Sequence, residues 1–254
     1  MTASLPMYDF GAASAAQDRL WQGIAAELAL RGLEAPPLLT RGMEDLMPHW
    51  LAPDLLMSQT CGSPFRNRLY GKVALIGTPD YRVEGCPPGH YCSMLVVRAD
   101  DPRASLADFD GATLAYNDPL SQSGWAAPQT EAQALGITLR PGPQTGAHRA
   151  SVRAVADGAA DLAAIDAVTW RLLRPIDPDA ARLRVIGQTR PTPGLPLITA
   201  QDRATEPLFE AIATAIAQLA PSDRDTLGLH GLIRIPPEAY LAVPNPQSPA
   251  QFAQ

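Results

Sequence analysis

The chain has 254 residues, of which 46% are hydrophobic and 18% are charged, a balance that is typical of a folded globular protein and excludes extended disorder. Its formal net charge is −6, and Lys and Arg form no run, so neither nucleic acid nor an anionic membrane surface is an expected partner. No apolar run is long enough to span a bilayer, and membrane insertion is not expected.

The chain begins MTASLPMYDF, which lacks the basic segment followed by an apolar segment that marks a signal peptide. This leaves two interpretations open: a cytoplasmic protein, or an exported one whose leader has been removed and replaced by Met1. The three cysteines, Cys61, Cys86 and Cys92, are an odd number, which argues against a disulfide framework. A Cys61–Cys86 pair nevertheless stays open.

Strands and helices are expected to alternate along the first part of the chain. Apolar residues at helical spacing, from Leu20 to Leu28, predict a helix from Ala12 to Arg31 that Gly32 ends. Short apolar runs predict strands at residues 3–7, 35–40, 54–58 and 72–78, with a short helix at 43–50. Alternation of this kind predicts an α/β fold with a mainly parallel sheet.

A second series of strands and helices follows a long predicted strand, Tyr91 to Arg98. Its expected strands are 112–116, 137–139, 161–165 and 183–187, and its expected helices are 129–135, 148–156 and 167–173. Asp166 is the expected N-cap of the last helix. The chain then returns with a strand at 197–200, helices at 206–219 and 222–229, and a Pro-rich tail.

This layout predicts two lobes. Residues 1–95 and 188–254 are expected to form a discontinuous first lobe, and residues 96–187 a second lobe inserted in its middle. Two chain crossings between such lobes would form a cleft that a hinge can close. Ligands of α/β sheets bind beyond the carboxyl ends of strands. The residues expected there are Tyr8 and Asp9, Thr60 and Cys61, Ser121 to Ser123, His148 and Asp166.

The stretch Asp110 to Trp125 reads DGATLAYNDPLSQSGW and ends a predicted strand in a turn rich in Ser and Gly. Such a turn gathers hydroxyls and free N–H groups, which are the donors that bind anions. Taken alone, the stretch is read more simply as a Ser N-cap with a tight turn. Pro128 does not fit an uninterrupted helix from Ser123, so we expect a separate Ser-rich turn and a helix that begins near Pro128.

Two stretches, GATLAYNDPLSQSGW and TGAHRASVRAVADGAADLAAIDAVTW, resemble the phosphonate/phosphite/phosphate-binding proteins of ABC importers. The segment from HYCSMLVVRADDP to LADFDGATLAYNDP is similar to the same family's first lobe crossing, and the resemblance covers about Pro88 to Trp170. It implies the class II periplasmic binding protein fold, with two α/β lobes. It also implies a monomeric periplasmic solute-binding protein that is not an enzyme and that works with an ABC transporter permease.

The resemblance also implies roles for individual residues. Ser121, Gln122 and Ser123 would hold the oxygens of a phosphonate or phosphate, although Gln122 stands where the family commonly has Thr or Ser. Tyr91 would reach the oxyanion, His148 would meet the ligand from the facing helix end, and Asp166 would contact the rest of the ligand. No motif supports Tyr8 and Thr60, which are expected at the site only because they follow strands.

The residues favour no catalytic chemistry. Cys61 has no recognisable pairing motif with any of the four histidines, as a catalytic cysteine requires, and the His and Cys positions lack the spacing of metal ligands. No cofactor is expected. The leading hypothesis is a receptor for a small phosphorus oxyanion or phosphonate. The alternatives are a sulfonate, a carboxylate or a thiamine-precursor ligand on the same fold, or a cytoplasmic sensor or enzyme built on it.

Overall fold

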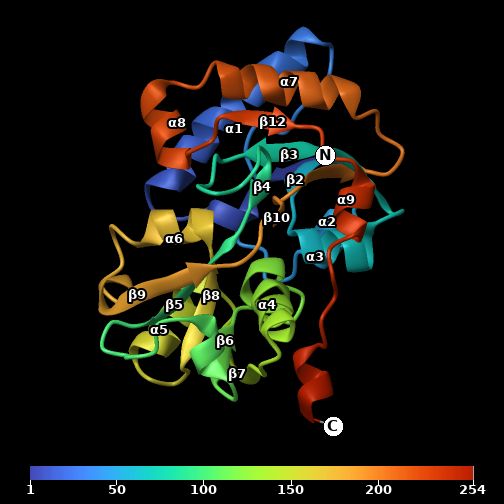
Figure 1. The fold of residues 1–254 in the computed structure, drawn as a ribbon. Coiled ribbons are helices and arrows are strands. Elements are labelled where there is room, and N and C mark those ends of the chain that lie inside the picture. The colour runs from blue at the N-terminus through green and yellow to red at the C-terminus, as the bar shows by residue number, and fades with distance from the viewer. Residues whose placement is uncertain (254) are drawn as a thin grey trace. The chain divides into compact units, whose positions relative to one another are not determined.

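A computed structural model describes residues 1–253 of the chain. The chain divides into two compact units (Figure 1): unit 1 comprises Met1–His90 and Pro193–Ala242, and unit 2 comprises Tyr91–Thr192 and the segment from Val243. The expected division into 1–95 with 188–254, and 96–187, therefore differs at the C-terminus. The segment from Val243 belongs with unit 2 because Trp125 holds it: the Trp125 indole N–H donates to the Gln247 carbonyl at 2.9 Å, and its ring packs on Phe252.

Unit 1 contains a five-stranded sheet in the order β1-β2-β11-β3-β12. β1 pairs parallel with β2, β11 runs antiparallel to both β2 and β3, and β12 is antiparallel to β3. Hence β1, β2 and β3 point the same way, and β11 and β12 oppose them. The strands are β1 (Thr2–Ser4), β2 (Leu55–Gln59), β3 (Val73–Asp80), β11 (Leu197–Ala200) and β12 (Gly231–Ile233).

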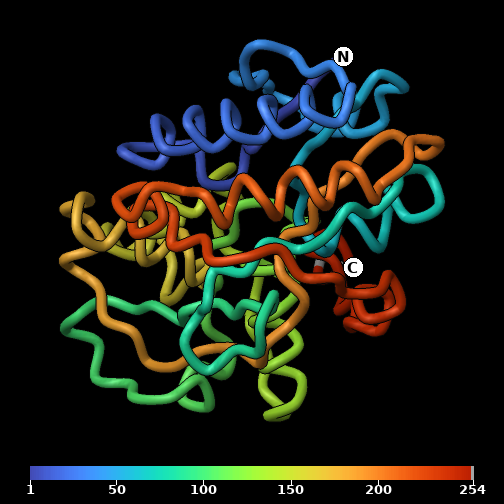
Figure 2. Tube along the Cα trace, turned by 90° about the horizontal axis from the view of Figure 1, so that it is seen from above, coloured from blue at the N-terminus to red at the C-terminus, as the bar shows by residue number. Residues whose placement is uncertain are grey.

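The longest helices of unit 1, α1 (Ala12–Leu30) and α7 (Glu206–Ala217), lie side by side (Figures 1 and 2). Arg19 of α1 forms a salt bridge of 2.6 Å with Asp223 of α8 (Pro221–Leu227). The shorter helical elements are η1 (Pro6–Tyr8), α2 (Met47–Trp50), α3 (Gly62–Pro64), η2 (Phe65–Leu69) and α9 (Pro237–Leu241). One apolar cluster of this unit comprises Trp50, Leu55, Phe65, Leu69, Val73, Ile198, Ile235 and Tyr240.

Unit 2 contains a second five-stranded sheet, in the order β7-β6-β8-β5-β9. β6 is parallel to both β7 and β8, and β5 is antiparallel to both β8 and β9. Four strands therefore point one way, and β5 opposes them. The strands are β5 (Ser93–Arg98), β6 (Thr113–Tyr116), β7 (Arg140–Gln144), β8 (Leu162–Asp166) and β9 (Leu183–Gln188).

The helical elements of unit 2 are η3 (Leu106–Phe109), η4 (Gln122–Ala126), α4 (Ala127–Leu135), α5 (His148–Ala156), α6 (Ala167–Leu173), η5 (Ala180–Arg182) and η6 (Pro249–Ala253). Three of these helices, α4, α5 and α6, follow the strands as the sequence predicts, and the shorter 3-10 and π-helical turns were not predicted. The apolar core of this unit includes strand residues such as Leu114, Leu162 and Val97, all fully buried. Two short strands at the chain crossings, β4 (His90–Tyr91) and β10 (Thr192–Pro193), pair with each other.

The expected α/β class is confirmed, but the sheets are mixed rather than mainly parallel in their pairing. Several local predictions were wrong. The strand expected at 35–40 is irregular, because its consecutive prolines cannot donate to a ladder. The strand expected at 137–139 begins later, as β7. The strand expected at 3–7 ends at Ser4, because Pro6 begins the 3-10 turn η1. The Pro-rich tail also contains α9, whose first residue, Pro237, occupies a position where a missing N–H costs nothing.

Candidate anion-binding site

The Ser-rich turn of unit 2 follows β6 and begins a helix directly. Ser121 is the N-cap of η4, a π-helical turn, and its Oγ accepts a hydrogen bond from the Gly124 N–H at 2.9 Å. Asp118 stabilises the backbone just before the turn, because its carboxylate accepts the Leu120 N–H at 2.7 Å. The α-helix proper begins at Ala127 with Pro128 in its first turn, as expected. The turn is nevertheless continuous with that helix, and the expectation of a separate Ser-rich turn was wrong.

Ser123 and His148 meet in this turn although they are far apart in the sequence. The Ser123 hydroxyl lies 2.8 Å from His148 Nε2 and 3.5 Å from the Ser121 hydroxyl. His148 is the first residue of α5, while Ser121 and Ser123 are buried. His148 Nδ1 is buried and has no hydrogen-bond partner within residues 1–253.

The protonation state of His148 decides which hydrogen-bond donors the Ser123–His148 pair presents to a ligand. Burial lowers the pKa of His148 to about 4, so the imidazole is neutral near pH 7. A neutral imidazole carries one N–H and serine one O–H, and the contact between them uses only one of these two protons. Whichever nitrogen is protonated, the pair therefore keeps one donor that is not used in their mutual bond.

The low pKa of His148 is directly testable. We expect an NMR titration of the folded protein to place the His148 pKa near 4, while the urea-unfolded chain titrates at the ordinary value of about 6.5. Since the unfolded state binds this proton first, His148 should lower the free energy of unfolding as the pH falls from about 6.5 towards 4. A folded-state pKa at or above 6.5 would contradict the desolvated imidazole.

Two residues that the sequence did not single out support the turn: Ser93 contacts it directly, and Thr189 contacts Ser93. The Ser93 hydroxyl of β5 donates to the Ser123 carbonyl at 3.0 Å, and the Ser93 N–H donates to the Thr189 hydroxyl at 2.9 Å. Ser93 lies two residues after Tyr91, inside an apolar strand. The signal available in the sequence was a serine within the mostly apolar run YCSMLVV.

Asn117, at the end of β6, is a third residue that sequence reasoning missed. Its side-chain Oδ1 is buried and has no hydrogen-bond partner in the described chain. A Cβ at Gly124 would collide with this Oδ1 and would lie 3.3 Å from the Ser121 hydroxyl. The Asn117 amide and the Ser121 hydroxyl therefore flank the same point above Gly124, and a glycine is needed there.

The structure divides the eight predicted site residues between the two units. Ser121, Gln122, Ser123 and His148 come together in unit 2. Tyr91 and Asp166 are buried in the same unit, and Asp166 caps α6 by accepting the N–H groups of Val168 and Thr169 at 2.8 and 3.0 Å.

Tyr8 and Thr60 belong to unit 1, where a small polar group surrounds the end of β2. The Gln59 amide donates to the Tyr81 hydroxyl at 3.2 Å, and the Tyr81 ring packs edge-on against Tyr8, with centroids 5.1 Å apart. Thr60 is fully buried, and its hydroxyl has no partner among residues 1–253. A ligand role for Tyr8 and Thr60 stays a prediction.

The cysteines and the potential metal ligands form no site of their own in the described chain. Cys61, Cys86 and Cys92 are all free of disulfides, so the Cys61–Cys86 pair is absent from this structure. No group of three or more His, Cys, Asp or Glu side chains within residues 1–253 is arranged to hold a metal ion.

A comparison with known protein families identifies the family of the chain. Residues 72–238, more than half of the sequence, match the family model described as ABC transporter, phosphonate, periplasmic substrate-binding protein. The chain belongs to this family. The members of the family are periplasmic substrate-binding components that work with an ABC transporter, and they are binding proteins, not enzymes. The resemblance inferred from the Ser-rich turn is thereby confirmed.

Solved structures support the fold. XAC2383 from Xanthomonas citri, bound to chloride ion, superposes with a TM-score of 0.71 at 16% identity, covering 94% of this chain and 92% of its own. PhnD1 from Prochlorococcus marinus, in complex with methylphosphonate, gives a TM-score of 0.69 at 16% identity and covers 94% of both chains. A binding protein component of an ABC phosphonate transporter from Pseudomonas aeruginosa gives 0.58 at 15% identity, over 91% of this chain and 80% of its own.

These likenesses confirm the two-lobed class II periplasmic binding protein fold. At this identity they show the fold alone. No curated protein sequence matches the chain. Among the described residues, no helix has both the length and the apolar character needed to cross a membrane.

Proposed function

We propose that this chain binds a small phosphorus oxyanion or phosphonate at the Ser121–Ser123 turn. The observation that carries the proposal is the convergence of Ser121, Ser123 and His148 on one turn, where a partly buried hydroxyl–imidazole pair keeps a spare donor. The methylphosphonate complex of PhnD1 from Prochlorococcus marinus, which shares the fold, supports this ligand class.

The chemistry of the turn suits reversible binding. A phosphonate oxygen is a strong acceptor that is satisfied by several hydrogen-bond donors. Ser121, Gln122, Ser123 and His148 supply hydroxyl, amide and imidazole groups without a fixed positive charge, since the imidazole is neutral near pH 7. Neutral donors hold an anion less tightly than a buried Arg or Lys would. We infer that they allow the ligand to be released to a permease.

Asn117 and Gly124 extend the proposed site. Because the Asn117 amide has a buried oxygen without a partner beside Ser121, we infer that it meets a ligand oxygen that carries a proton, such as the P–OH of a phosphonate monoanion. A sulfonate has no such proton near neutral pH. The wild-type protein should therefore bind methylphosphonate more tightly than the isosteric methanesulfonate.

Replacing Gly124 by alanine tests the close approach of Asn117. The new Cβ would occupy the place of Asn117 Oδ1, so the amide must rotate away. We expect a loss of affinity for methylphosphonate of about tenfold, the size of one hydrogen bond to a charged group. Gly187→Ala, also in unit 2, is the control for replacing a glycine, because Gly187 has no positive φ and an added Cβ there would meet only the Leu95 side chain, at 4.0 Å. Equal affinity losses in both variants would contradict a specific role for Asn117.

Isothermal titration calorimetry is the direct test of the ligand class. Phosphate, phosphite, methylphosphonate, 2-aminoethylphosphonate and methanesulfonate should be titrated into the purified chain. Saturable binding of at least one phosphorus ligand is expected. Silence for all phosphorus compounds would remove the proposed ligand. Methanesulfonate binding alone would favour the second candidate, a sulfonate receptor, which Gln122 supports because it replaces a hydroxyl donor with an amide.

We further propose that the protein acts as a monomeric periplasmic receptor whose partner is an ABC transporter permease. Family membership supports the partner and the compartment. The acidic balance, with a net charge of −6, supports a role without nucleic acid. Light scattering of the purified chain checks the monomer, and fractionation of native cells checks the compartment.

A further inference from the structure

Unit 1 contains a cavity of about 460 Å³, a size within the range of small-molecule sites. Three segments form it: the end of α2 with the residues after it, the residue before β3, and the turn after β11. Its lining comprises Trp50, Leu51, Ala52, Pro53, Lys72, Ala200, Gln201, Asp202 and Arg203.

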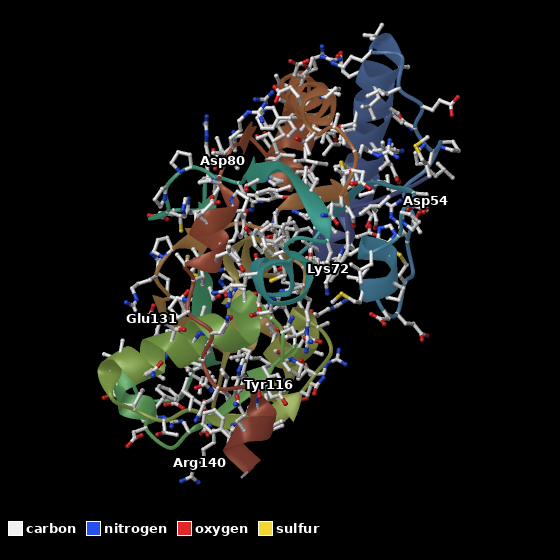
Figure 3. The ribbon with its side chains drawn as sticks, turned by 90° about the vertical axis from the view of Figure 1, so that its right-hand side faces the viewer. Asp54, Lys72, Asp80, Tyr116, Glu131 and Arg140 are labelled. Carbon is white, nitrogen blue, oxygen red and sulfur yellow. The ribbon has the colours of Figure 1, made fainter. Side chains whose placement is uncertain are left out.

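The cavity lies at the end of the sheet opposite to the polar group around Gln59. Figure 3 labels Lys72 just before β3 and Asp80 at the end of that strand. Ala200, at the end of the antiparallel strand β11, pairs with Val73, the first residue of β3. The cavity is built by unit 1 alone and shares no residue with the Ser121–Ser123 turn, so an inference about it does not rest on the proposed function.

The cavity lining holds two cations, Lys72 and Arg203, and one carboxylate, Asp202. Lys72 is the single lysine of the chain, and within residues 1–253 neither Lys72 nor Arg203 takes part in an ion pair of 4 Å or less. The Arg203 Nε atom is also buried and has no acceptor in the described chain. A buried N–H without a partner is costly, and more so on a charged group. The nearby Asp54 is engaged elsewhere, because its carboxylate lies 3.0 Å from the N-terminal ammonium.

The wall beside these cations is apolar. Trp50 is only 5% exposed, and its indole N–H already donates to the Gln59 carbonyl at 3.2 Å. It therefore has no hydrogen-bond donor left for a ligand and presents ring carbons only. Leu51, at 43% exposed, and Pro53 continue this surface. An anionic head beside an apolar body is the ligand shape that complements such a lining.

We propose that this cavity binds a small organic carboxylate, whose carboxylate group pairs with Lys72 and Arg203 and whose apolar body packs against Trp50 and Leu51. Asp202 in the same lining selects against dianions, since a second negative charge would lie near its carboxylate. The ligand class differs from that of the turn in unit 2.

Benzoate is the probe that tests the proposal, by calorimetry in the presence of excess methylphosphonate so that the turn in unit 2 is saturated. We expect one benzoate per chain, with acetate binding more weakly because it lacks the apolar body. Lys72→Gln and Arg203→Gln should each weaken benzoate binding by about tenfold or more. Arg68→Gln, which removes an exposed charge of unit 1 outside the cavity, is the matched control and should bind as the wild type does.

Lysine footprinting of the wild-type chain provides a readout that needs no variant. Because Lys72 is the single lysine, its rate of acetylation is read by mass spectrometry of its peptide, separately from the amino group of Met1. Benzoate should slow acetylation of Lys72, and an equal concentration of sodium chloride should not. The proposal is overturned if millimolar benzoate gives no saturable binding, if chloride protects Lys72 equally, or if Arg68→Gln weakens binding as much as the cavity variants do.

Discussion

Ser123→Ala should weaken the binding of methylphosphonate by about 10- to 100-fold, the loss expected for a hydrogen bond to a charged group. The hydroxyl is buried, contacts His148 Nε2 at 2.8 Å and lies 3.5 Å from the Ser121 hydroxyl. Its removal takes away a donor and also frees the imidazole that it orients. Calorimetry at pH 7 measures the loss.

Ser4→Ala is the matched control for this variant. Ser4 is a buried serine of unit 1, and its hydroxyl donates to the Thr40 carbonyl at 2.8 Å. It should lower the melting temperature without changing the affinity for methylphosphonate. If Ser123→Ala kept wild-type affinity for every phosphorus ligand that binds, the turn would be an ordinary helix N-cap and not an anion site.

The sequence predicted where the helices of this site begin better than it predicted which side chains of the site contact one another. His148 begins α5 and Asp166 caps α6 at the residues where periodicity and cap chemistry placed them, because both signals are local in the chain. The contact of Ser123 with His148 joins residues 25 positions apart. The strand-end layout and the family resemblance placed both residues at the ligand, but neither predicted their contact with each other, and the spacing of the two residues does not suggest it.

The supports of the turn could not be read from the sequence for a physical reason. Ser93 and Asn117 act through side chains whose partners are set by sheet pairing: Ser93 lies opposite Asp166 in the β5–β8 ladder, and Asn117 packs over Gly124. A lone hydroxyl in a strand or an Asn after one fits many environments. The strand β7 was missed for another reason. Pro141 and Pro143 argue against a strand in the sequence, but β7 lies at the edge of its sheet, where proline is tolerated.

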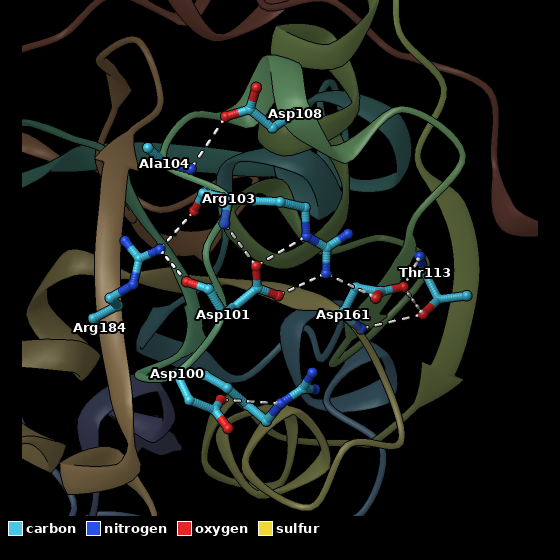
Figure 4. Close-up of polar contacts among 9 residues, drawn as sticks. Asp100, Asp101, Arg103, Ala104, Asp108, Thr113, Asp161 and Arg184 are labelled. Atoms are coloured by element: carbon cyan, nitrogen blue, oxygen red, sulfur yellow. Dashed lines mark hydrogen bonds and ion pairs between the residues drawn. The ribbon is translucent and has the colours of Figure 1, made fainter.

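Arg103→Gln should lower the free energy of unfolding of unit 2 by about 3 kcal/mol, because it leaves a buried carboxylate without its cation. The guanidinium contacts both oxygens of Asp101, at 3.0 and 2.6 Å, and reaches Asp161 at 3.1 Å (Figure 4). Asp161 in turn accepts the N–H and the hydroxyl of Thr113, both at 2.8 Å. One arginine thus ties the segment after β5 to the start of β6 and to the residue before β8.

Arg153→Gln is the control for charge removal alone. Its ion pair with Asp179 is exposed on the arginine side, and such pairs contribute less than about 1 kcal/mol. Differential scanning calorimetry at pH 7 compares the two variants. Equal destabilisation would show that the Arg103 network contributes no more to the free energy of unfolding than an exposed ion pair does.

Acid should weaken the same network in a defined pH range. The hydrogen bonds from Arg103 lower the pKa of Asp101 from 3.8 to about 2, so the folded state holds this carboxylate ionised when the unfolded chain already binds the proton. The resulting stabilisation, about 2 kcal/mol, is present in full above pH 4 and is lost as the pH falls through about 2. Arg103→Gln should therefore flatten the fall in stability between pH 4 and 2. Since the Arg103 side chain makes the largest contribution to the low pKa of Asp101, an unchanged slope in that range would assign the low pKa to another cause.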